Sequence, residues 1–233
     1  MQAPSATSIL SHGPDQFRVT VLQPTKPVRT VLFSVGRGGD PVRHLPLLAH
    51  LANQGCAVVA PHFDQLASPV PVVEELLSRA RRLELAMEAF ALPGLPSAGI
   101  GHSIGASMLL ALVGGQAQTL ARKQLSLRTK VGFDRLVLFT PAIDFFRAPG
   151  ALDSVDTPIL AWAGARDVIT PPEQVEFLRN ALEARTKVEV RLVEDAGHFT
   201  FMNDLPPHVV DPYPDRAAFL ADLADEVAHF VTA

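Results

Sequence analysis

Short runs of apolar residues recur along the chain and predict the strands of a sheet. Residues 17–22 alternate apolar and polar side chains, which is typical of a strand at an edge or with one exposed face. Residues 30–35 are almost all apolar, as a strand covered on both faces is. Further runs predict strands over residues 57–60, 98–101, 135–140, 158–163 and 188–193.

Longer segments between these runs carry apolar residues at helical spacing. They predict helices over residues 44–53, 72–90, 104–113, 172–184 and 216–231. Residues 104–113 are almost wholly apolar, which indicates a buried helix. One side of the helix over residues 72–90 carries the charged residues Glu74, Glu75, Arg79, Arg81 and Arg82.

Strands and helices alternate along the chain, which predicts a mainly parallel, doubly wound α/β sheet with helices on both faces. The length of 233 residues suits one well-filled core, so a single domain over residues 1–233 is expected. The longest segments without an assigned element, residues 114–133 and 141–157, are too short for a large cap domain.

Composition narrows the expected partners and compartment. The chain carries 20 Lys and Arg against 24 Asp and Glu and has no basic block, so nucleic acid is not an expected partner. No apolar run approaches ~18 residues and no signal peptide is recognisable, so no membrane partner is expected and a cytoplasmic location is the default. The single cysteine, Cys56, is interpreted as a small buried hydrophobic residue, which fits a reducing compartment.

A short turn flanked by glycines is the strongest indication of chemistry. Residues 101–105 read Gly-His-Ser-Ile-Gly, between a predicted strand and a predicted buried helix. In that context the G-x-S-x-G pattern is typical of a nucleophilic serine on a sharp turn, where only small neighbours avoid a clash. The helix N-terminus behind Ser103 would favour developing negative charge. The pattern alone is equally compatible with a strand-to-helix turn capped by a serine.

Two further loops supply an acid and a base at matching positions. Asp167 follows the strand predicted over residues 158–163, and His198 follows the strand predicted over residues 188–193. In a parallel sheet both loops and the Ser103 turn lie at the carboxyl ends of strands, and the order Ser, Asp, His is that of hydrolases built on such a sheet. We therefore expect Ser103, His198 and Asp167 to form a catalytic triad. Asp144, which follows the preceding strand, is the alternative acid.

Backbone N–H groups are expected to stabilise the oxyanion of such a reaction. One belongs to Ile104, directly after the serine, and the other to Arg37 in the glycine-rich segment 36–41. That segment can also be interpreted as a flexible glycine turn. A rival hypothesis for Arg37 is that its guanidinium binds a carboxylate on an acidic substrate.

On these residues, the chain resembles the α/β-hydrolase superfamily over nearly its whole length. Within it, the sequence is similar to small dienelactone-hydrolase-like and platelet-activating-factor-acetylhydrolase-like serine esterases. Residues 36–41 resemble their H-G-x-G-G-x-P oxyanion loop, residues 101–105 their nucleophile turn and residues 196–201 their C-terminal segment. Two positions depart from the pattern, because Val35 stands where relatives usually have His and Ser103 where dienelactone hydrolases have Cys.

The resemblance implies a carboxylic-ester hydrolase that acts on a small soluble ester, lactone or thioester without a cofactor. Phe145 and Phe199 lie in loops on the catalytic side and are expected to bind substrate, with Phe146 and Phe201 as further candidates; each fits a core position equally well. An acyltransferase with the same triad and a non-catalytic binding protein on the same scaffold remain open alternatives.

Two other classes of site fit the sequence less well. A metal site is not expected, because the spacing of its candidate ligands does not match a metal motif. These candidates are the pair His62 and Asp64 and the pair His44 and His50. The glycines of residues 99–105 loosely match a dinucleotide fingerprint, but no acidic residue ends a strand about 20 residues later.

Overall fold

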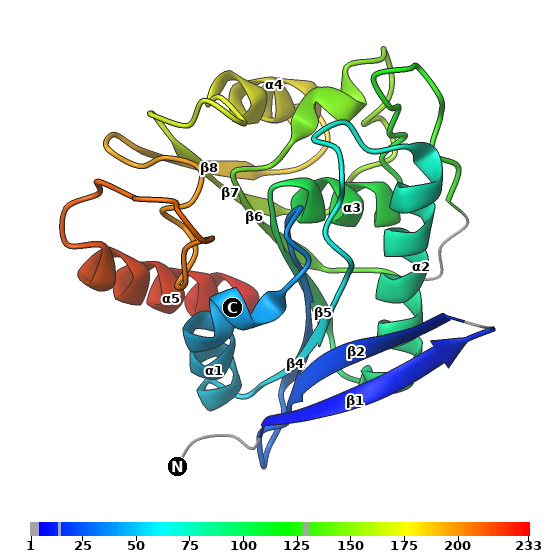
Figure 1. Ribbon diagram of the computed structural model, residues 1–233, viewed down its shortest axis with the longest axis vertical. Helices are drawn as coiled ribbons and strands as arrows, with labels where there is room; N and C mark the ends of the chain where they lie inside the picture. The colour runs from blue at the N-terminus through cyan, green and yellow to red at the C-terminus, as the bar shows by residue number, and fades with distance from the viewer. Residues whose placement is uncertain (1–4, 14, 128–130) are drawn as a thin grey trace.

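The computed structural model describes residues 5–13, 15–127 and 131–233, and one eight-stranded sheet runs through its centre (Figure 1). The spatial order of the strands is β1-β2-β4-β3-β5-β6-β7-β8. Their bounds are β1 Ser5–His12, β2 Asp15–Leu22, β3 Arg29–Ser34, β4 Cys56–Pro61, β5 Ser97–His102, β6 Arg135–Phe139, β7 Ile159–Gly164 and β8 Val188–Val193. The strands from β3 to β8 pair in parallel, so the mainly parallel sheet expected from the sequence is confirmed.

The strand β1 has no counterpart among the predicted strands. It forms an antiparallel hairpin with β2 at one edge of the sheet. Its sequence is mostly small and polar, and the side chain of Ile9 is exposed. β1 therefore buries little apolar area and shows only a weak pattern of apolar residues in the sequence. β2 is therefore an inner strand, and one of its faces is exposed only in its first half, where Phe17 is buried and Arg18 is exposed.

Helices cover both faces of the sheet (Figure 1). Their bounds are η1 Pro41–His44, α1 Leu45–Asn53, α2 Val73–Phe90, α3 Ile104–Leu112, η2 Ile143–Phe146, α4 Glu173–Leu182 and α5 Arg216–Thr232, where η marks a 3₁₀ helix. Helices α1 and α5 enclose one half of the core with the β3 side chain Phe33. Helices α2, α3 and α4 enclose the other half with Leu32, so β3 is apolar at successive positions because both of its faces are covered.

The connection from β6 to β7 is short and carries no cap. Residues 140–158 are all described, and η2 is the one helix among them. None of the helices in the described part of the chain is long and apolar enough to cross a membrane. Cys56 is free and buried, and burial raises the pKa of its thiol to about 11, which agrees with a packing role.

The chain reverses its direction across the sheet at β3. From β3 it crosses to β4 on one side and then returns through α2 to β5 on the other side. Because β3 and β5 are neighbouring parallel strands, the loops that follow them leave the carboxyl edge side by side. Ligands of α/β proteins bind in the crevice at such a reversal.

Candidate active site

Ser103 is the single residue between β5 and α3. Its backbone has φ 56° and ψ −125°, and a non-glycine residue rarely has a positive φ. Its N–H donates to the carbonyl of Phe139 on the neighbouring strand β6 (2.9 Å), which holds the turn against the sheet. Backbone strain of this kind persists only where the surroundings impose it, and it is concentrated at functional positions.

Two glycines allow the turn to pack, as the pattern predicted. A β-carbon on Gly105 would lie 2.1 Å from the carbonyl oxygen of Ser34, and one on Gly101 would lie 2.6 Å from Cα of Ala106. Real β-carbons do not approach backbone atoms this closely. A larger residue at Gly105 would therefore displace the serine turn from β3, and one at Gly101 would displace the first turn of α3 from β5.

His198 and Asp167 form a buried pair at the same edge of the sheet. Nδ1 of His198 lies 2.8 Å from Oδ2 of Asp167, and the carboxylate side chain has no exposed surface. Oδ2 also accepts a hydrogen bond from the Thr170 hydroxyl (2.8 Å), while Oδ1 accepts from the N–H groups of Ile169 (2.8 Å) and Thr170 (2.9 Å). Burial alone would raise the pKa of Asp167, but the hydrogen bonds and charge from His198 and the two bonds from Thr170 lower it overall. The carboxylate therefore stays ionised beside the ring.

The loops that carry this pair are joined through their backbones. The N–H of Arg166 donates to the carbonyl of Ala196 (2.9 Å). Gly164 at the end of β7 permits this approach, because a β-carbon there would lie 2.3 Å from the same carbonyl oxygen. Asp144, the alternative acid, is instead exposed and pairs with Arg147 at 2.9 Å. The structure thus joins His198 to Asp167.

Two more histidines lie behind His198. Nε2 of His102 lies 3.1 Å from the carbonyl oxygen of His198, so this nitrogen carries the proton and donates. The ring centroid of His102 lies 5.0 Å from that of His198 and 5.5 Å from that of His44. Burial lowers the pKa of His102 well below its usual value and that of His44 to about 3. Both rings are therefore neutral and place no positive charge beside His198.

The glycine-rich segment after β3 runs alongside the serine. A β-carbon on Gly36 would lie 3.4 Å from Cβ of Ser103, and the N–H of Gly39 donates to the Gly36 carbonyl (3.2 Å) to close a tight turn. Among the described residues, the N–H groups of Arg37 and Ile104 have no hydrogen-bond partner. Unpaired N–H groups beside a serine hydroxyl are the arrangement that stabilises an oxyanion.

Arg79 is buried, although the sequence pattern groups it with the charged side of α2. Only 3% of its surface is exposed, and its guanidinium donates to carbonyls of the segment that follows β3. Helical periodicity does not separate a solvated arginine from one whose long side chain turns under a loop. This residue and Thr170 are the site neighbours that the sequence analysis did not identify.

No protein-family model and no curated protein sequence matches the chain. Solved structures match it over nearly its full length. Esterase 2 of Thermogutta terrifontis, phosphorylated by paraoxon, has a TM-score of 0.69 at 15% identity, with 96% of this chain and 92% of that one covered. An esterase of Pyrococcus furiosus has a TM-score of 0.68 at 14% identity, with 99% and 92% covered. A predicted CIB-like hydrolase of Thermoplasma acidophilum has a TM-score of 0.66 at 12% identity, with 97% and 99% covered.

The chain has the α/β-hydrolase fold. The segment after β3, the turn after β5 and the loop after β8 carry the motifs on which the sequence resemblance depends. At the fold level that resemblance is confirmed, and at these identities the likeness concerns the fold alone.

The aromatic residues at the carboxyl edge of this α/β-hydrolase fold have different surroundings. Phe199 is half-buried, and its ring lies edge-on to the His198 ring, with the two ring centroids 5.2 Å apart. Phe145 is partly buried and packs against the core. Phe146 and Phe201 are each 1% exposed and belong to the core, so they do not wall a substrate pocket.

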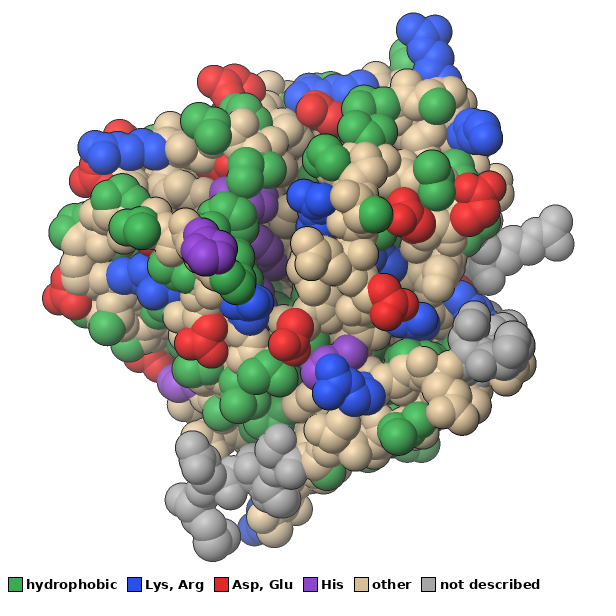
Figure 2. Space-filling model, in the orientation of Figure 1, with side chains coloured by type: hydrophobic (Ala, Val, Ile, Leu, Met, Phe, Trp, Pro, Cys, Tyr) green, Lys and Arg blue, Asp and Glu red, His purple; other side chains and the backbone are tan. Residues whose placement is uncertain are grey.

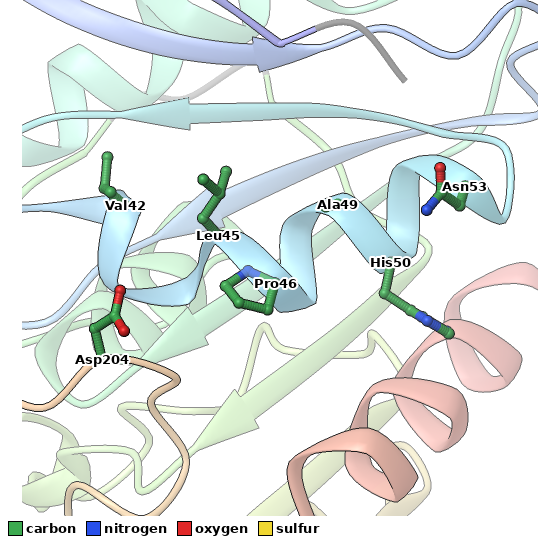
Figure 3. A pocket seen from close by; sticks show the side chains of 7 residues that line it. All are labelled: Val42, Leu45, Pro46, Ala49, His50, Asn53 and Asp204. Atoms are coloured by element: carbon green, nitrogen blue, oxygen red, sulfur yellow. The ribbon is translucent and has the colours of Figure 1, made fainter. Parts of the chain in front are cut away.

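The surface has a hollow near the middle of the face drawn in Figure 2, with histidine side chains beside it. A separate groove of about 490 Å³ follows α1 and contains none of the residues of the candidate site (Figure 3). Its lining residues are Val42, Leu45, Pro46, Ala49, His50, Asn53 and Asp204. In Figure 3, His50 points toward α5, where its Nε2 lies 3.0 Å from Asp225.

The histidine and carboxylate positions weighed as metal ligands are used in other ways. Nε2 of His62 lies 2.8 Å from the Thr20 hydroxyl, and the side chain is buried. Asp64 is exposed and pairs with Arg82 at 3.2 Å. Within residues 5–13, 15–127 and 131–233, no three His, Cys, Asp or Glu side chains are grouped closely enough to hold a metal ion.

Proposed function

We propose that the protein is a serine hydrolase that cleaves small carboxylic esters, with Ser103 as nucleophile, His198 as base and Asp167 as the acid that orients the base. The observation that carries this proposal is the strained Ser103 turn at the same sheet edge as the buried His198–Asp167 pair. The esterases among the structural neighbours support a hydrolase of this kind, and one of them is phosphorylated by paraoxon. A dienelactone-hydrolase-like specificity and a cytoplasmic location belong to the same proposal.

The first half of the reaction acylates the serine. Nε2 of His198 takes the proton of Ser103 Oγ as Oγ attacks the ester carbonyl. Nδ1–H stays bonded to Asp167 (2.8 Å), so the ring keeps the tautomer that leaves Nε2 free to accept. Among the described side chains Ser103 Oγ has no hydrogen-bond partner, and such contacts commonly tighten only when substrate binds.

Acylation ends when the tetrahedral intermediate collapses and the departing alcohol takes the proton from His198. The second half then releases the acid. Water then gives a proton to His198 and attacks the acyl-serine, and His198 returns that proton to Ser103 Oγ as the second intermediate collapses and the carboxylic acid leaves. Both oxyanions are stabilised by the N–H groups of Arg37 and Ile104, the latter at the N-terminus of α3.

A graded series of p-nitrophenyl esters tests the proposed activity and its substrate class. We expect kcat/KM to be highest for short or medium acyl chains on soluble esters. In the described part of the chain no cap covers the Ser103 edge, and we expect Phe145 and Phe199 to bound a small acyl site. Stopped assays from acetyl to palmitoyl esters measure this preference. Faster hydrolysis of an emulsified long-chain triglyceride would contradict the substrate class, and inactivity on the whole series would contradict the esterase.

Substitutions of Arg37 separate a backbone role from a side-chain role. Two guanidinium donors of Arg37 are bonded to the carbonyls of Leu66 (2.9 Å) and Ala67 (3.0 Å), which argues against a free carboxylate-binding fork. We expect Arg37→Ala to keep kcat on neutral esters within a few-fold, because its N–H remains. Arg37→Pro lacks the N–H and should lose about 10²–10³-fold in kcat.

The control for Arg37→Pro is circular dichroism, since proline also restricts the loop. If Arg37→Ala lowers kcat for neutral esters a hundredfold, the backbone-donor role is wrong. If it instead raises KM only for carboxylated esters, the guanidinium binds the substrate.

Thr170→Val removes one hydroxyl that supports the acid. The hydroxyl donates to Oδ2 of Asp167 and lies 3.0 Å from the Thr140 carbonyl, while the two N–H bonds to Oδ1 persist in the variant. We expect kcat to fall roughly tenfold, the equivalent of ~1.4 kcal/mol, because the carboxylate is less firmly held. Thr157→Val is the control, because it also loses a buried hydroxyl-to-carbonyl bond, to Phe133 (3.3 Å). Equal kcat in the two variants at equal loss of stability would refute the role of Thr170.

A further inference from the structure

Four backbone carbonyls converge on the buried guanidinium of Arg79. Nη1 donates to the carbonyls of Val35 (3.3 Å) and Gly36 (3.1 Å), and Nη2 donates to that of Arg37 (3.2 Å). Nη2 also reaches the carbonyl of Asp64 (3.2 Å). One side chain from the middle of α2 therefore holds three successive carbonyls of the segment beside Ser103.

A charged side chain such as that of Arg79 is costly to bury, and a contact that only filled space would not need one. Among the described residues no carboxylate forms an ion pair with it, and its Nε has no partner. Burial, together with the neighbouring charge of Arg82, lowers the pKa of Arg79 to about 10, so the side chain stays charged at neutral pH. A buried cation without a paired carboxylate lowers stability unless its hydrogen bonds compensate.

The bond to Gly36 determines the direction of a neighbouring N–H group. A trans peptide unit is planar, so its carbonyl and its N–H point to opposite sides. The Gly36 carbonyl and the Arg37 N–H belong to the same unit. When Arg79 holds the carbonyl toward α2, the Arg37 N–H must point away from α2. Gly36 itself packs against Ser103, so this unit lies at the serine.

We propose that Arg79 is a positioning residue that orients the Arg37 N–H toward the oxyanion formed on Ser103. This inference rests on the proposed ester hydrolysis and adds a determinant of its rate. The charged donor on the Gly36 oxygen also polarises the peptide unit, which strengthens the N–H as a donor. The glycines of the segment leave its backbone free to adopt other orientations. The Gly39 N–H is the other donor to the Gly36 oxygen (3.2 Å), and Arg79 adds a charged donor from outside the segment.

The test compares Arg79→Met, Arg79→Lys and the matched control Arg82→Met. Methionine keeps much of the volume of the side chain and removes all its donors, whereas lysine keeps the charge but not the fork. Arg82 lies on the same helix, and its partners are the Asp64 side chain (3.2 Å) and the His62 carbonyl (3.5 Å), outside residues 35–37. All three variants are first checked for fold by circular dichroism and thermal unfolding.

We expect Arg79→Met to lower kcat about 10²-fold on a neutral ester, approaching the loss of one oxyanion donor, with KM changed less than about threefold. The kcat of Arg79→Lys should fall between those of Arg79→Met and the wild type, and the kcat of Arg82→Met should match that of the wild type. A trifluoromethyl ketone, which forms a tetrahedral oxyanion on the serine, should lose affinity in Arg79→Met by the same factor as kcat/KM. A merely structural role would not produce this split between kcat and KM.

A crystal structure of Arg79→Met supplies a second measurement that does not depend on turnover. We expect the peptide between Gly36 and Arg37 to rotate or to adopt more than one orientation, with Ser103 and His198 unmoved. An unchanged peptide, or the same kcat in Arg79→Met and Arg82→Met, overturns the proposal for Arg79 while leaving the esterase intact. An inactive wild-type protein would instead contradict the proposed function.

Discussion

Ser103→Ala is expected to lower kcat for ester hydrolysis roughly 10⁶-fold, which is the typical loss when the nucleophile of such a triad is removed. The fold should persist. Alanine keeps the β-carbon that packs beside Gly36, and the hydroxyl that is lost has no hydrogen-bond partner among the described residues. The change in the free energy of unfolding should therefore stay within about 1 kcal/mol.

Ser107→Ala is the matched control for this variant. Ser107 lies one turn along α3, is fully buried, and donates its hydroxyl to the Ala142 carbonyl. It should lose stability through that hydrogen bond and keep most of its activity. Steady-state hydrolysis of p-nitrophenyl acetate measures both variants. Near-native turnover in purified Ser103→Ala would show that another residue is the nucleophile.

Asp167→Asn is expected to lower kcat on the order of 10⁴-fold, through the tautomer of His198. Oδ1 of Asp167 accepts from the N–H groups of Ile169 and Thr170, so the amide oxygen of asparagine should take that place. The amide NH₂ would then face Nδ1 of His198. Because two donors cannot share a hydrogen bond, the ring would move its proton to Nε2 and lose the lone pair that accepts from Ser103.

Asp144→Asn distinguishes the two candidate acids. Asp144 is exposed beside Arg147, so its neutralisation should leave kcat close to that of the wild type. Measurements of kcat for both variants under the same conditions are sufficient. A large loss in Asp144→Asn combined with a small loss in Asp167→Asn would reverse the assignment of the acid.

The central strands could be predicted because both faces of a parallel sheet are buried, and the positions of Ser103, Asp167 and His198 after strands could be predicted with them. The strand β3 is buried at every position, and its central residues 31–33 are all apolar. The residues after β5, β7 and β8 must lie at one edge, because these strands run in parallel. Parallel pairing then places Ser103, Asp167 and His198 at one edge of the sheet before any side-chain contact is known.

The features that could not be predicted are those with no periodic signal. β1 is held by backbone hydrogen bonds to β2, and its mostly small, polar side chains give almost no sequence signal for that pairing. Arg79 occupies a polar position of an amphipathic helix, and only the path of a distant loop decides that its guanidinium is covered. Phe146 and Phe201 show the same limit, because a loop position does not reveal which aromatic ring turns into the core.

Covalent labelling with a fluorophosphonate is the most direct test of the central claim that Ser103 is an activated nucleophile. The wild-type protein is treated with the reagent, its intact mass is recorded, and the modified peptide is sequenced by mass spectrometry. We expect one adduct on Ser103, formed rapidly in the wild type and slowed strongly in His198→Ala, which lacks the base. No adduct on the folded wild-type protein, or an adduct on a different serine, would contradict the claim.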